Sequence, residues 1–273
     1  MRESLQKYFR MEKLPHIWCP GCGHGIITGS VVRAIDNLEL DQKRICIVSG
    51  IGCSSRAPGY LNFNTLHTTH GRALAFATGI KLARPDLKVI VLTGDGDCSA
   101  IGGNHFIHAC RRNIDLTTIV FNNNIYGMTS GQYSPMTPKG AYATTAPYGN
   151  IDRNFDLCSL AQSAGATYVG RGTVYHVPQL IKLVEKALQH KGFSFIEVMS
   201  ICPTYFGRKN KLGTPVKMME MLRDNCVPVK SAERLSKQEL QNKVIIGEFY
   251  QEQAPEYTEE YDRIIQMAQE GVK

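Results

Sequence analysis

The regular alternation of helical and strand-like segments is the feature that most restricts how this chain can fold. Between residues 25 and 200, apolar residues at helical spacing alternate with short runs rich in β-branched residues. The expected helices cover residues 25–38, 73–84, 103–113, 156–165 and 178–190, and the expected strands cover residues 45–48, 89–92, 117–121, 166–170 and 193–200. Parallel strands need long crossover connections, and helices supply them. We therefore expect an α/β fold with a mostly parallel sheet flanked by helices.

Two regions interrupt this alternation. Residues 123–155 form a long connection rich in Gly, Pro, Thr and Tyr, and loops of this length in compact proteins are commonly functional or disordered. After Cys202 the alternation stops, and a polar segment leads to the acidic and aromatic sequence EYTEEYDRII at residues 256–265. We therefore expect a main domain over residues 1–202 and a C-terminal extension over residues 203–273 that packs on the body or on a partner.

The composition and charge argue against some classes of protein. The chain of 273 residues is 43% apolar and 20% charged, as in ordinary globular proteins. Its net charge of +7 is modest and no long basic run occurs, so nucleic acid is not an expected partner. The N-terminus lacks the apolar core of a signal peptide, and no segment has the length of a membrane span. We expect a cytoplasmic protein with no membrane partner, in which the nine cysteines are metal ligands or core residues and form no disulfides.

Unusual residues directly follow four of the expected strands. IGCSS (51–55) comes after the first strand, GDGD (94–97) after the second, NNN (122–124) after the third, and Cys202 after the last. Ligands of open parallel sheets bind in the crevice outside the carboxyl ends of the strands. We therefore expect these four clusters to lie on one edge of one sheet.

The GDGD and NNN clusters together predict a site for a metal-bridged phosphate. Asp95 offers a carboxylate and Asn123 or its neighbours offer an amide oxygen, which are ligands suited to Mg²⁺ or Ca²⁺. Mg²⁺ usually completes its coordination with phosphate oxygens and water. Gly94 and Gly96 allow backbone N–H groups to approach an anion, and a helix expected from about residue 102 adds a positive dipole end. Either cluster alone would be read as a polar turn.

The cysteines allow more than one interpretation. Cys19 and Cys22 form a CxxC pair at the start of a helix, a pattern found in zinc sites, redox pairs and cluster sites. Cys53 and Cys202 follow strands on the same expected edge, so a site of four thiolates could hold zinc or an iron–sulfur cluster. The remaining cysteines are expected to be core residues: Cys46, Cys98, Cys110, Cys158 and Cys226. We expect His105, His108 and Cys110, on one helix, to be packing residues and not a metal site.

The motifs resemble one known family. GDG followed by NN at this interval resembles the thiamine diphosphate fingerprint. The similarity extends through CPGCGHG (19–25), VSGIGCSS (48–55), HGRALAFATGIK (70–81), GDGDCSAIGGNH (94–105), RRNIDLTTIVFNNNIYGMTSGQ (111–132) and CPTYFGRKN (202–210). Over roughly residues 15–215 the chain resembles the β subunit of 2-oxoacid:ferredoxin oxidoreductases, most of all the 2-oxoglutarate branch.

The resemblance implies a thiamine diphosphate-binding fold and assigns roles to individual residues. The implied Mg²⁺ ligands are Asp95, Asn123 and the backbone carbonyl of Ile125, and the implied diphosphate contacts are Gly96, Asp97, Gly127 and Met128. The thiazolium side of the cofactor is implied to be lined by Ile51, Gly52, Cys53, Ser54, His70, Gly71, Arg72 and Ala73. His70 and Arg72 are the expected catalytic residues, although His70 could instead be a helix-start residue that bonds to backbone. One [4Fe–4S] cluster is implied on Cys19, Cys22, Cys53 and Cys202.

The resemblance also implies an activity and partners. The implied reaction is oxidative decarboxylation of 2-oxoglutarate with coenzyme A to succinyl-CoA and CO₂, with electrons passed through the cluster to ferredoxin; such enzymes can also fix CO₂. In relatives a separate domain supplies the glutamate that activates the cofactor, and no second αβ domain of suitable length is evident here. The chain is therefore expected to work only with an α subunit, as a heterodimer or heterotetramer, and with ferredoxin or a ferredoxin-like subunit.

Several alternatives stay open at this point. The same chemistry could act on pyruvate or another 2-oxoacid, because some relatives carry a lysine at the position of Ser130. Arg208, Lys209 and Lys211 could meet a substrate carboxylate, a coenzyme A phosphate or only solvent. A non-redox thiamine diphosphate decarboxylase or carboligase subunit would share GDGD and NN but would not need the four cysteines. A zinc module that binds nucleic acid would leave GDGD and NNN unexplained.

Overall fold

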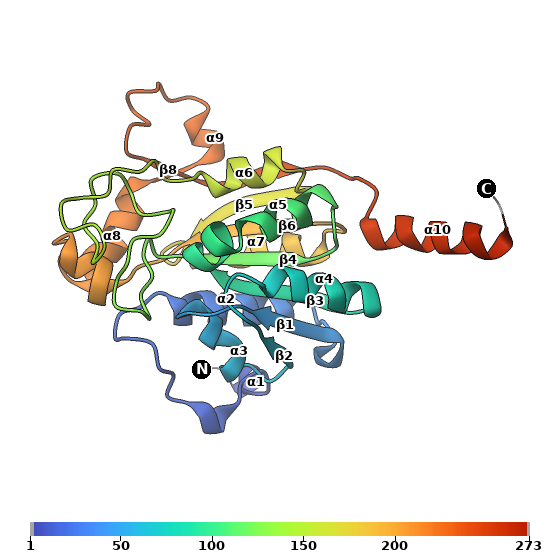
Figure 1. Cartoon of the computed structure of the whole chain (residues 1–273). Coiled ribbons are helices and arrows are strands. Elements are labelled where there is room, and N and C mark those ends of the chain that lie inside the picture. Colours follow the sequence, from blue (N-terminus) through green and yellow to red (C-terminus); the bar gives the residue numbers. More distant parts are fainter. Residues whose placement is uncertain (1–2, 272–273) are drawn as a thin grey trace.

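An eight-stranded, mostly parallel sheet forms the centre of the computed structural model, which describes residues 3–271 (Figure 1). The strands are β1 (Ile45–Ser49), β2 (Asn64–His67), β3 (Lys88–Gly94), β4 (Thr117–Asn122), β5 (Tyr168–Thr173), β6 (Ser194–Met199), β7 (Cys226–Pro228) and β8 (Val244–Gln251). Their order is β2-β1-β3-β4-β6-β5-β8-β7. All neighbouring strands are parallel except β5 and β8, which are antiparallel. The predicted fold class is confirmed.

Helices connect and cover the strands. The α-helices are α1 (Glu3–Gln6), α2 (His24–Asn37), α3 (Ala57–Tyr60), α4 (Ala73–Ala83), α5 (Gly103–Arg111), α6 (Leu157–Ser163), α7 (Val177–Gln189), α8 (Pro215–Asn225), α9 (Val229–Ala232) and α10 (Tyr257–Glu270). Short 3₁₀ or π turns cover Met11–Lys13, Gln42–Arg44, Ser54–Arg56, Asp97–Ile101 and Pro203–Gly207. The five expected helices and five expected strands all form, with boundaries shifted by a few residues.

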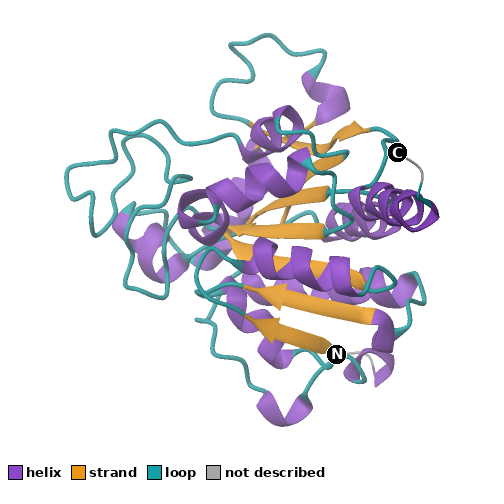
Figure 2. Cartoon of the chain, turned by 45° about the vertical axis from the view of Figure 1, so that its right-hand side comes forward, coloured by secondary structure: helices purple, strands orange, loops and turns teal. Residues whose placement is uncertain are grey.

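The sheet buries both of its faces against helices (Figure 2). Alternate residues of β3 divide between two hydrophobic cores, because successive side chains of a strand point to opposite faces. Ile90 and Leu92 pack in the core that contains α2 and α7, whereas Val89 and Val91 pack in the core that contains α4, α5 and α6. A strand with both faces buried must be apolar at successive positions, which is why these runs are recognisable in the sequence.

Three strands, β2, β7 and β8, were not predicted. β2 is a half-exposed edge strand of mixed composition that pairs with β1. β7 has only three residues. β8 lies inside the predicted C-terminal extension and pairs antiparallel with β5, so this part of the extension continues the sheet of the body.

The C-terminal helix α10 projects from the body (Figure 1), but its base is fixed. The buried Glu256 side chain accepts hydrogen bonds from the backbone N–H groups of Thr258 and Glu259 and so caps the helix. The other carboxylate oxygen accepts from the N–H of Asp115 at 3.0 Å. The direction in which α10 leaves the sheet is therefore set by one buried carboxylate.

Within residues 3–271, every helix is too short or too polar to cross a membrane.

Candidate active site at the carboxyl edge of the sheet

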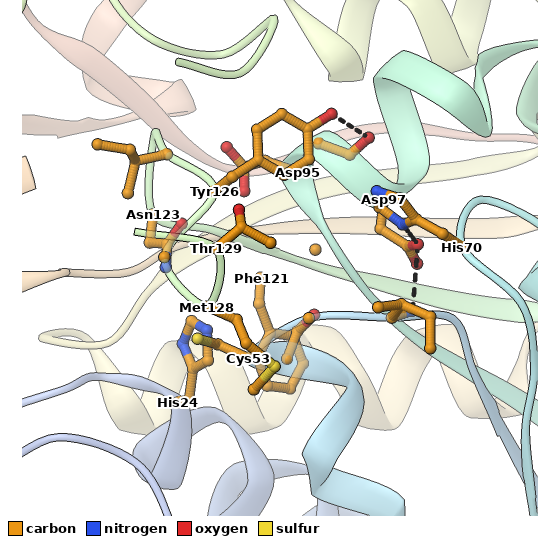
Figure 3. A pocket seen from close by; sticks show the side chains of 17 residues that line it. His24, Cys53, His70, Asp95, Asp97, Phe121, Asn123, Tyr126, Met128 and Thr129 are labelled. Carbon is orange, nitrogen blue, oxygen red and sulfur yellow. Dashed lines mark hydrogen bonds and ion pairs between the residues drawn. The ribbon is translucent and has the colours of Figure 1, made fainter. Parts of the chain in front are cut away.

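The predicted strand-end clusters meet at one edge of the sheet. β1, β3, β4 and β6 are neighbours and run parallel, so the segments that follow them emerge side by side. A hollow at this edge (Figure 3) is lined by His24, Ile51, Gly52, Cys53, Ser54, His70, Gly94, Asp95, Gly96, Asp97, Phe121, Asn123, Ile125, Tyr126, Gly127, Met128 and Thr129. The prediction of one shared edge is confirmed.

Asp95 is a buried carboxylate with no cationic partner among the described residues. Burial raises its pKa to about 7, although the hydroxyl of Ser134 donates to Oδ2 at 2.5 Å and opposes this shift. An anion in such surroundings is stabilised by a nearby positive charge. The side chain lines the hollow and can accept a metal ion there.

The turn after β4 brings two further oxygen donors to the same hollow. Asn123 is buried and lines the hollow, and among the described residues no hydrogen bond engages its side chain. Asn124 adopts the left-handed conformation with φ of 62°, which Asn tolerates better than most residues. The chain then reverses so that Ile125 also lines the hollow, and no described N–H or O–H group donates to its carbonyl. Asp95, Asn123 and Ile125 together form an oxygen-only donor set, which suits Mg²⁺.

The side chain of Asp97 is fully engaged by the protein. Its Oδ1 accepts hydrogen bonds from the N–H groups of Ile51 at 3.2 Å and Gly71 at 2.7 Å, and it also contacts Nδ1 of His70. Its Oδ2 accepts from the hydroxyl of Thr93 at 2.6 Å. Asp97 thus ties the loop after β1 and the loop before α4 to β3. If Asp97 contacts a diphosphate, the group left free to do so is its backbone N–H.

Helical structure starts earlier than expected. A π turn covers Asp97–Ile101 and leads into α5, so the chain becomes helical immediately after Gly96 and not at residue 102. A side chain at Gly96 has no room, because a Cβ there would lie 2.2 Å from Cζ of Tyr126. The Tyr126 hydroxyl donates to the Gly96 carbonyl at 3.1 Å. The aromatic ring therefore packs directly on the backbone of the GDGD segment.

The segment of residues 70–73 contributes less to the hollow than predicted. His70 lines it, and its ring is bonded to Asp97 and packs edge-on against Tyr126. Gly71, Arg72 and Ala73 are not among the lining residues. Since α4 begins at Ala73 and leads the chain away, Arg72 instead donates to the carbonyl of Ile101 at 3.1 Å, and Ala73 packs in the core. The catalytic role expected of Arg72 stays a prediction.

The four predicted cysteine ligands gather around a second hollow. This hollow is lined by Ile17, Trp18, Cys19, Cys22, Cys53, Asn123, Gly127, Met128, Cys202, Pro203, Thr204 and Tyr205. The indole N–H of Trp18 donates to the carbonyl of Cys53 at 2.7 Å and ties the N-terminal arm to the loop after β1. Gly21 has φ of 80°, and a Cβ there would lie 2.5 Å from Pro215, so this CxxC turn needs glycine.

Three thiols of this group, those of Cys22, Cys53 and Cys202, have raised pKa values. Burial raises the pKa of Cys22 to about 12 and that of Cys53 to about 11, and neighbouring thiols of the group add to both shifts. Burial also raises the pKa of Cys202. A metal centre that binds thiolates would supply the positive charge that this site lacks.

The two hollows are adjacent and share part of their walls. Cys53, Asn123, Gly127 and Met128 line both of them. Cys53 lies in the loop after β1, and the others lie in the loop after β4. A group bound in one hollow would therefore be a close neighbour of a group bound in the other.

Several residues of the site were missed by the sequence reasoning. His24, Phe121, Tyr126 and Thr129 line the first hollow, and Ser134 binds Asp95 from the long connection. His24 lies two residues after the CxxC motif and Tyr126 two residues after NNN, so closeness to a motif was an available signal. For Ser134 the local sequence gives no signal, because only the path of the long connection brings it to Asp95.

Four of the five other cysteines lie where they were predicted. Cys46, Cys98, Cys110 and Cys158 are buried in the core, but Cys226 on the short strand β7 is only half-buried and is not a core residue. Among the described residues, His105, His108 and Cys110 do not form a group with ligand atoms within 4.8 Å of one another. Arg208 is exposed near the ring of Tyr205, with 6.0 Å between its guanidinium carbon and the ring centroid.

The fold and the site define an enzyme domain of the thiamine diphosphate class. The family model described as "Thiamine pyrophosphate enzyme, C-terminal TPP binding domain" matches residues 50–198, which include the loops after β1, β3 and β4. A 2-oxoglutarate:ferredoxin oxidoreductase from Magnetococcus marinus, solved with 2-oxoglutarate, coenzyme A and succinyl-CoA bound, has a similar structure. Its TM-score is 0.87 at 34% identity, over 97% of this chain and 90% of that one.

Sequence relatives narrow the class further. The 2-oxoglutarate synthase subunit KorB of Methanocaldococcus jannaschii is 55% identical over 260 residues, which cover 95% of this chain and 96% of the relative. The 2-oxoacid:ferredoxin oxidoreductase subunit beta of Saccharolobus solfataricus is 48% identical over 190 residues, which cover 69% of this chain and 62% of the relative. The chain belongs to the family of 2-oxoacid:ferredoxin oxidoreductase β subunits.

Proposed function

We propose that this chain is the cofactor-binding β subunit of an enzyme that converts 2-oxoglutarate and coenzyme A to succinyl-CoA and CO₂. In this proposal it binds thiamine diphosphate with Mg²⁺ in the first hollow and a [4Fe–4S] cluster in the second, and it delivers electrons to ferredoxin. The observation that carries the proposal is the shared wall of the two hollows. A redox enzyme needs its electron donor and acceptor close together, whereas a structural metal site has no reason to adjoin an active site.

The residues of the first hollow fit a metal-bound diphosphate. Within residues 3–271, Asp95 is buried without a counter-ion, and the Asn123 side chain and the Ile125 carbonyl have no hydrogen-bond partner, so they are free to bind a cation. In the proposal these three groups hold Mg²⁺. Gly96, Gly127, Met128 and the backbone of Asp97 adjoin the diphosphate at the start of a helical segment, where N–H groups lack partners within the helix.

Bound thiamine diphosphate would supply the electron sink that stabilises the negative charge left when the substrate loses CO₂. The protein's part is to position and shield the reacting groups. Asp97 holds the loops that carry Ile51 and His70 in fixed positions beside the hollow. In the proposal Ile51, Gly52, Cys53, Ser54 and His70 line the thiazolium side, and the contribution predicted for Arg72 would require contacts outside the hollow of this chain.

The spacing of the four thiols fits a cluster better than zinc. In a tetrahedral zinc site with Zn–S bonds of about 2.3 Å, the sulfur atoms lie about 3.8 Å apart. Among residues 3–271, the only group of three or more His, Cys, Asp or Glu ligand atoms within 4.8 Å of one another is that of Asp156, Cys158 and Glu197. No three of the four thiols are that close, although all four line one hollow. A wider inorganic centre is therefore the better fit.

The proposed substrate and partners rest on the relatives. The Methanocaldococcus relative is named for 2-oxoglutarate, and the Magnetococcus structure holds 2-oxoglutarate, coenzyme A and succinyl-CoA. The relatives are named as subunits, and we infer an α subunit that covers the hollow and completes the cofactor site. Ile51 and Met128 support this inference, because both are apolar, line the first hollow and are 40% and 46% exposed. The unpaired cysteines suit the reducing cytoplasm as the place where such a complex works.

Anaerobic assay of the chain with and without its partner subunits tests the reaction. We expect reduction of a viologen dye that depends on 2-oxoglutarate, coenzyme A, thiamine diphosphate and Mg²⁺, and no turnover by the chain alone. Asp95→Asn should abolish Mg²⁺-dependent cofactor binding, whereas the surface control Asp86→Asn should not. A preference for pyruvate would correct the substrate, and turnover by a partner-free chain would refute the need for an α subunit.

Visible absorption of anaerobically purified protein tests the cluster. Cys53→Ser should remove the broad absorption of an iron–sulfur centre, together with its iron and sulfide, while the control Cys226→Ser should keep both. A colourless wild-type protein with one Zn²⁺ per chain would contradict this part of the proposal. Colourless protein that still decarboxylates 2-oxoacids would favour the non-redox alternative.

A further inference from the structure

A buried network of charged side chains lies beside the proposed metal site. Glu197 on β6 is 1% exposed, and its Oε2 accepts a hydrogen bond from Nε of Arg171 on β5 at 2.6 Å. A second nitrogen of Arg171 donates to Asp156, the N-cap residue of α6, also at 2.6 Å. The thiol of Cys158 contacts Oε2 of Glu197 at 3.7 Å. One guanidinium is thus shared by the buried carboxylate of Glu197 and the exposed carboxylate of Asp156.

This cluster is not itself a metal site. The ligand atoms of Asp156, Cys158 and Glu197 lie within 4.8 Å of one another, which is a spacing that could hold a cation. Arg171 already supplies the positive charge, because it bonds to both carboxylates with close to ideal distances. The cluster therefore needs no further cation. Its function depends on the other residues that hydrogen-bond to its carboxylates.

The second oxygen of Glu197 holds the end of β4. Oε1 accepts a hydrogen bond from the side-chain amide of Asn122 at 2.6 Å. With its amide N–H₂ fixed in this way, Asn122 presents Oδ1 to the backbone N–H of Asn124, which donates to it at 3.0 Å. This bond spans Asn123, the proposed Mg²⁺ ligand, so it closes the turn that aims Asn123 and Ile125 into the first hollow.

A second bond fixes the same turn from the other side. The hydroxyl of Thr137 donates to the carbonyl of Asn124 at 2.6 Å. Asn124 carries the left-handed conformation of the turn, with φ of 62°, and both of its backbone polar groups are therefore held. Side-chain and peptide groups that orient the ligands of a metal determine its affinity almost as much as the ligands do.

We propose that Glu197, balanced by Arg171, is a positioning residue for the Mg²⁺ site and acts through Asn122 on the turn of residues 122–125. This inference rests on the function proposed above. A buried ion pair by itself gives little evidence of a contribution to stability. Glu197 of this pair is hydrogen-bonded to Asn122, which directly precedes the proposed metal ligand Asn123. This position gives the pair a specific role.

The network also gives the C-terminal extension a part in the site. The Arg171 guanidinium donates to the carbonyl of Ile245 at 3.3 Å and packs over the ring of Phe249 at 5.2 Å, and both residues belong to β8. β8 is the neighbour of β5 on the side away from β6, and it therefore contacts the guanidinium from that side. By shielding the Arg171–Glu197 pair from water, the extension strengthens the interaction on which the turn depends.

Mg²⁺ titration of the anaerobically purified complex with its partner subunit tests the inference. Retention of thiamine diphosphate is measured by equilibrium dialysis as the Mg²⁺ concentration increases, and thermal unfolding is recorded for each variant. Asn122→Ala and Glu197→Gln should raise the half-saturating Mg²⁺ concentration by about 10-fold or more, as for other groups that orient metal ligands. Asn122→Ala leaves the Arg171–Glu197 pair intact, so it tests the inference even if Glu197→Gln fails to fold.

The chain offers a closely matched control pair on its surface. The amide of Asn37 donates to Oε1 of Glu185 at 2.6 Å, the same length as the Asn122–Glu197 bond, but this pair is exposed. Asn37→Ala and Glu185→Gln should change the half-saturating Mg²⁺ concentration by less than 2-fold. If Asn122→Ala lowered the melting temperature but left the Mg²⁺ requirement unchanged, the network would be structural only and the inference would be wrong. If the wild-type complex showed no Mg²⁺-dependent retention, the proposed function itself would fail.

Discussion

Replacement of Asp97 by alanine tests whether one carboxylate holds the cofactor loops together. Asp97 accepts hydrogen bonds from Ile51, His70, Gly71 and Thr93, which lie on three different segments of the chain. The alanine variant would leave all four donors without their acceptor. Water can reach Ile51 and His70, which are partly exposed, but it cannot easily replace the carboxylate at the buried Gly71 and Thr93.

The magnitude follows from the two buried donors. Each buried polar group left without a partner costs about 1–3 kcal/mol, so two such groups give about 4 kcal/mol of lost stability. For a domain of this size, a loss of 1 kcal/mol lowers the melting temperature by roughly 2–4 °C, which predicts a decrease of about 8–16 °C. Asp97→Asn keeps the size of the side chain and one acceptor oxygen, so it should lose only about half as much stability. Some stability is still lost, because hydrogen bonds to a neutral acceptor are weaker than those to a carboxylate.

Thermal and urea unfolding of the purified wild-type, Asp97→Ala and Asp97→Asn proteins provide the measurement. Thiamine diphosphate affinity should fall in the same order, since the loops that carry Ile51 and His70 lose their shared anchor. A loss of less than about 1 kcal/mol in Asp97→Ala would refute the reasoning, because it would mean that the four hydrogen bonds are replaced by water at no cost. Unchanged cofactor affinity in a destabilised variant would separate the anchoring role from the proposed function.

Two further predictions concern close packing and buried charge. Gly96→Ala should weaken thiamine diphosphate binding, because the new Cβ would lie 2.2 Å from the Tyr126 ring, and overpacking of this kind costs about 1–3 kcal/mol. In equilibrium dialysis the control variant Gly79→Ala should bind the cofactor normally, because its Cβ meets no atom within 4 Å. Equal binding by the two variants would contradict the prediction. Lys81→Met should destabilise the protein by about 1.5–3 kcal/mol at pH 7, because the buried Asp115 loses a charge-assisted hydrogen bond of 2.6 Å, while Lys191 remains 3.9 Å from its carboxylate. Burial raises the pKa of Asp115, but Lys88 and Lys81 lower it more, so that the net pKa is below 3.8. A depressed carboxyl pKa stabilises the fold above the unfolded-state pKa of about 3.9, and this stabilisation is lost as the pH falls below it. Unfolding measured from pH 7 to pH 2 should therefore show a shallower loss below about pH 4 in the Lys81→Met variant than in the wild type, and parallel curves would refute the assignment.

The arrangement of the site depends on strand order more than on any single motif. β1, β3, β4 and β6 are neighbours in the sheet, and each ends at the same edge. β5 comes before β6 in the chain, but β6 and not β5 is the neighbour of β4 in the sheet. The loop after β6 therefore lies next to the loop after β4. That order places Cys202 beside Cys53 and Asn123 around one hollow.

The sequence by itself determined the fold class and most of the central elements, and it predicted that the segments after β1, β3, β4 and β6 meet at one edge of the sheet. Strands such as β3 are buried on both faces and must be continuously apolar, so they can be recognised locally. Asp95 and Asn123 follow such strands, and a parallel sheet brings its carboxyl ends to one edge. The edge strand β2 and the three-residue strand β7 carry no such signal, because their partners and not their composition make them strands.

Only the tertiary structure decided how individual side chains are used. Asp97 and Arg72 belong to motifs, yet the side chain of Asp97 is occupied by four protein donors and that of Arg72 donates to the carbonyl of Ile101. Ser134 and Glu197 belong to no motif, yet the fold places one on Asp95 and the other on Asn122. A hydrogen bond depends on positions within a fraction of an ångström, and these positions are set by contacts between segments far apart in the chain. Local sequence patterns do not encode such distances.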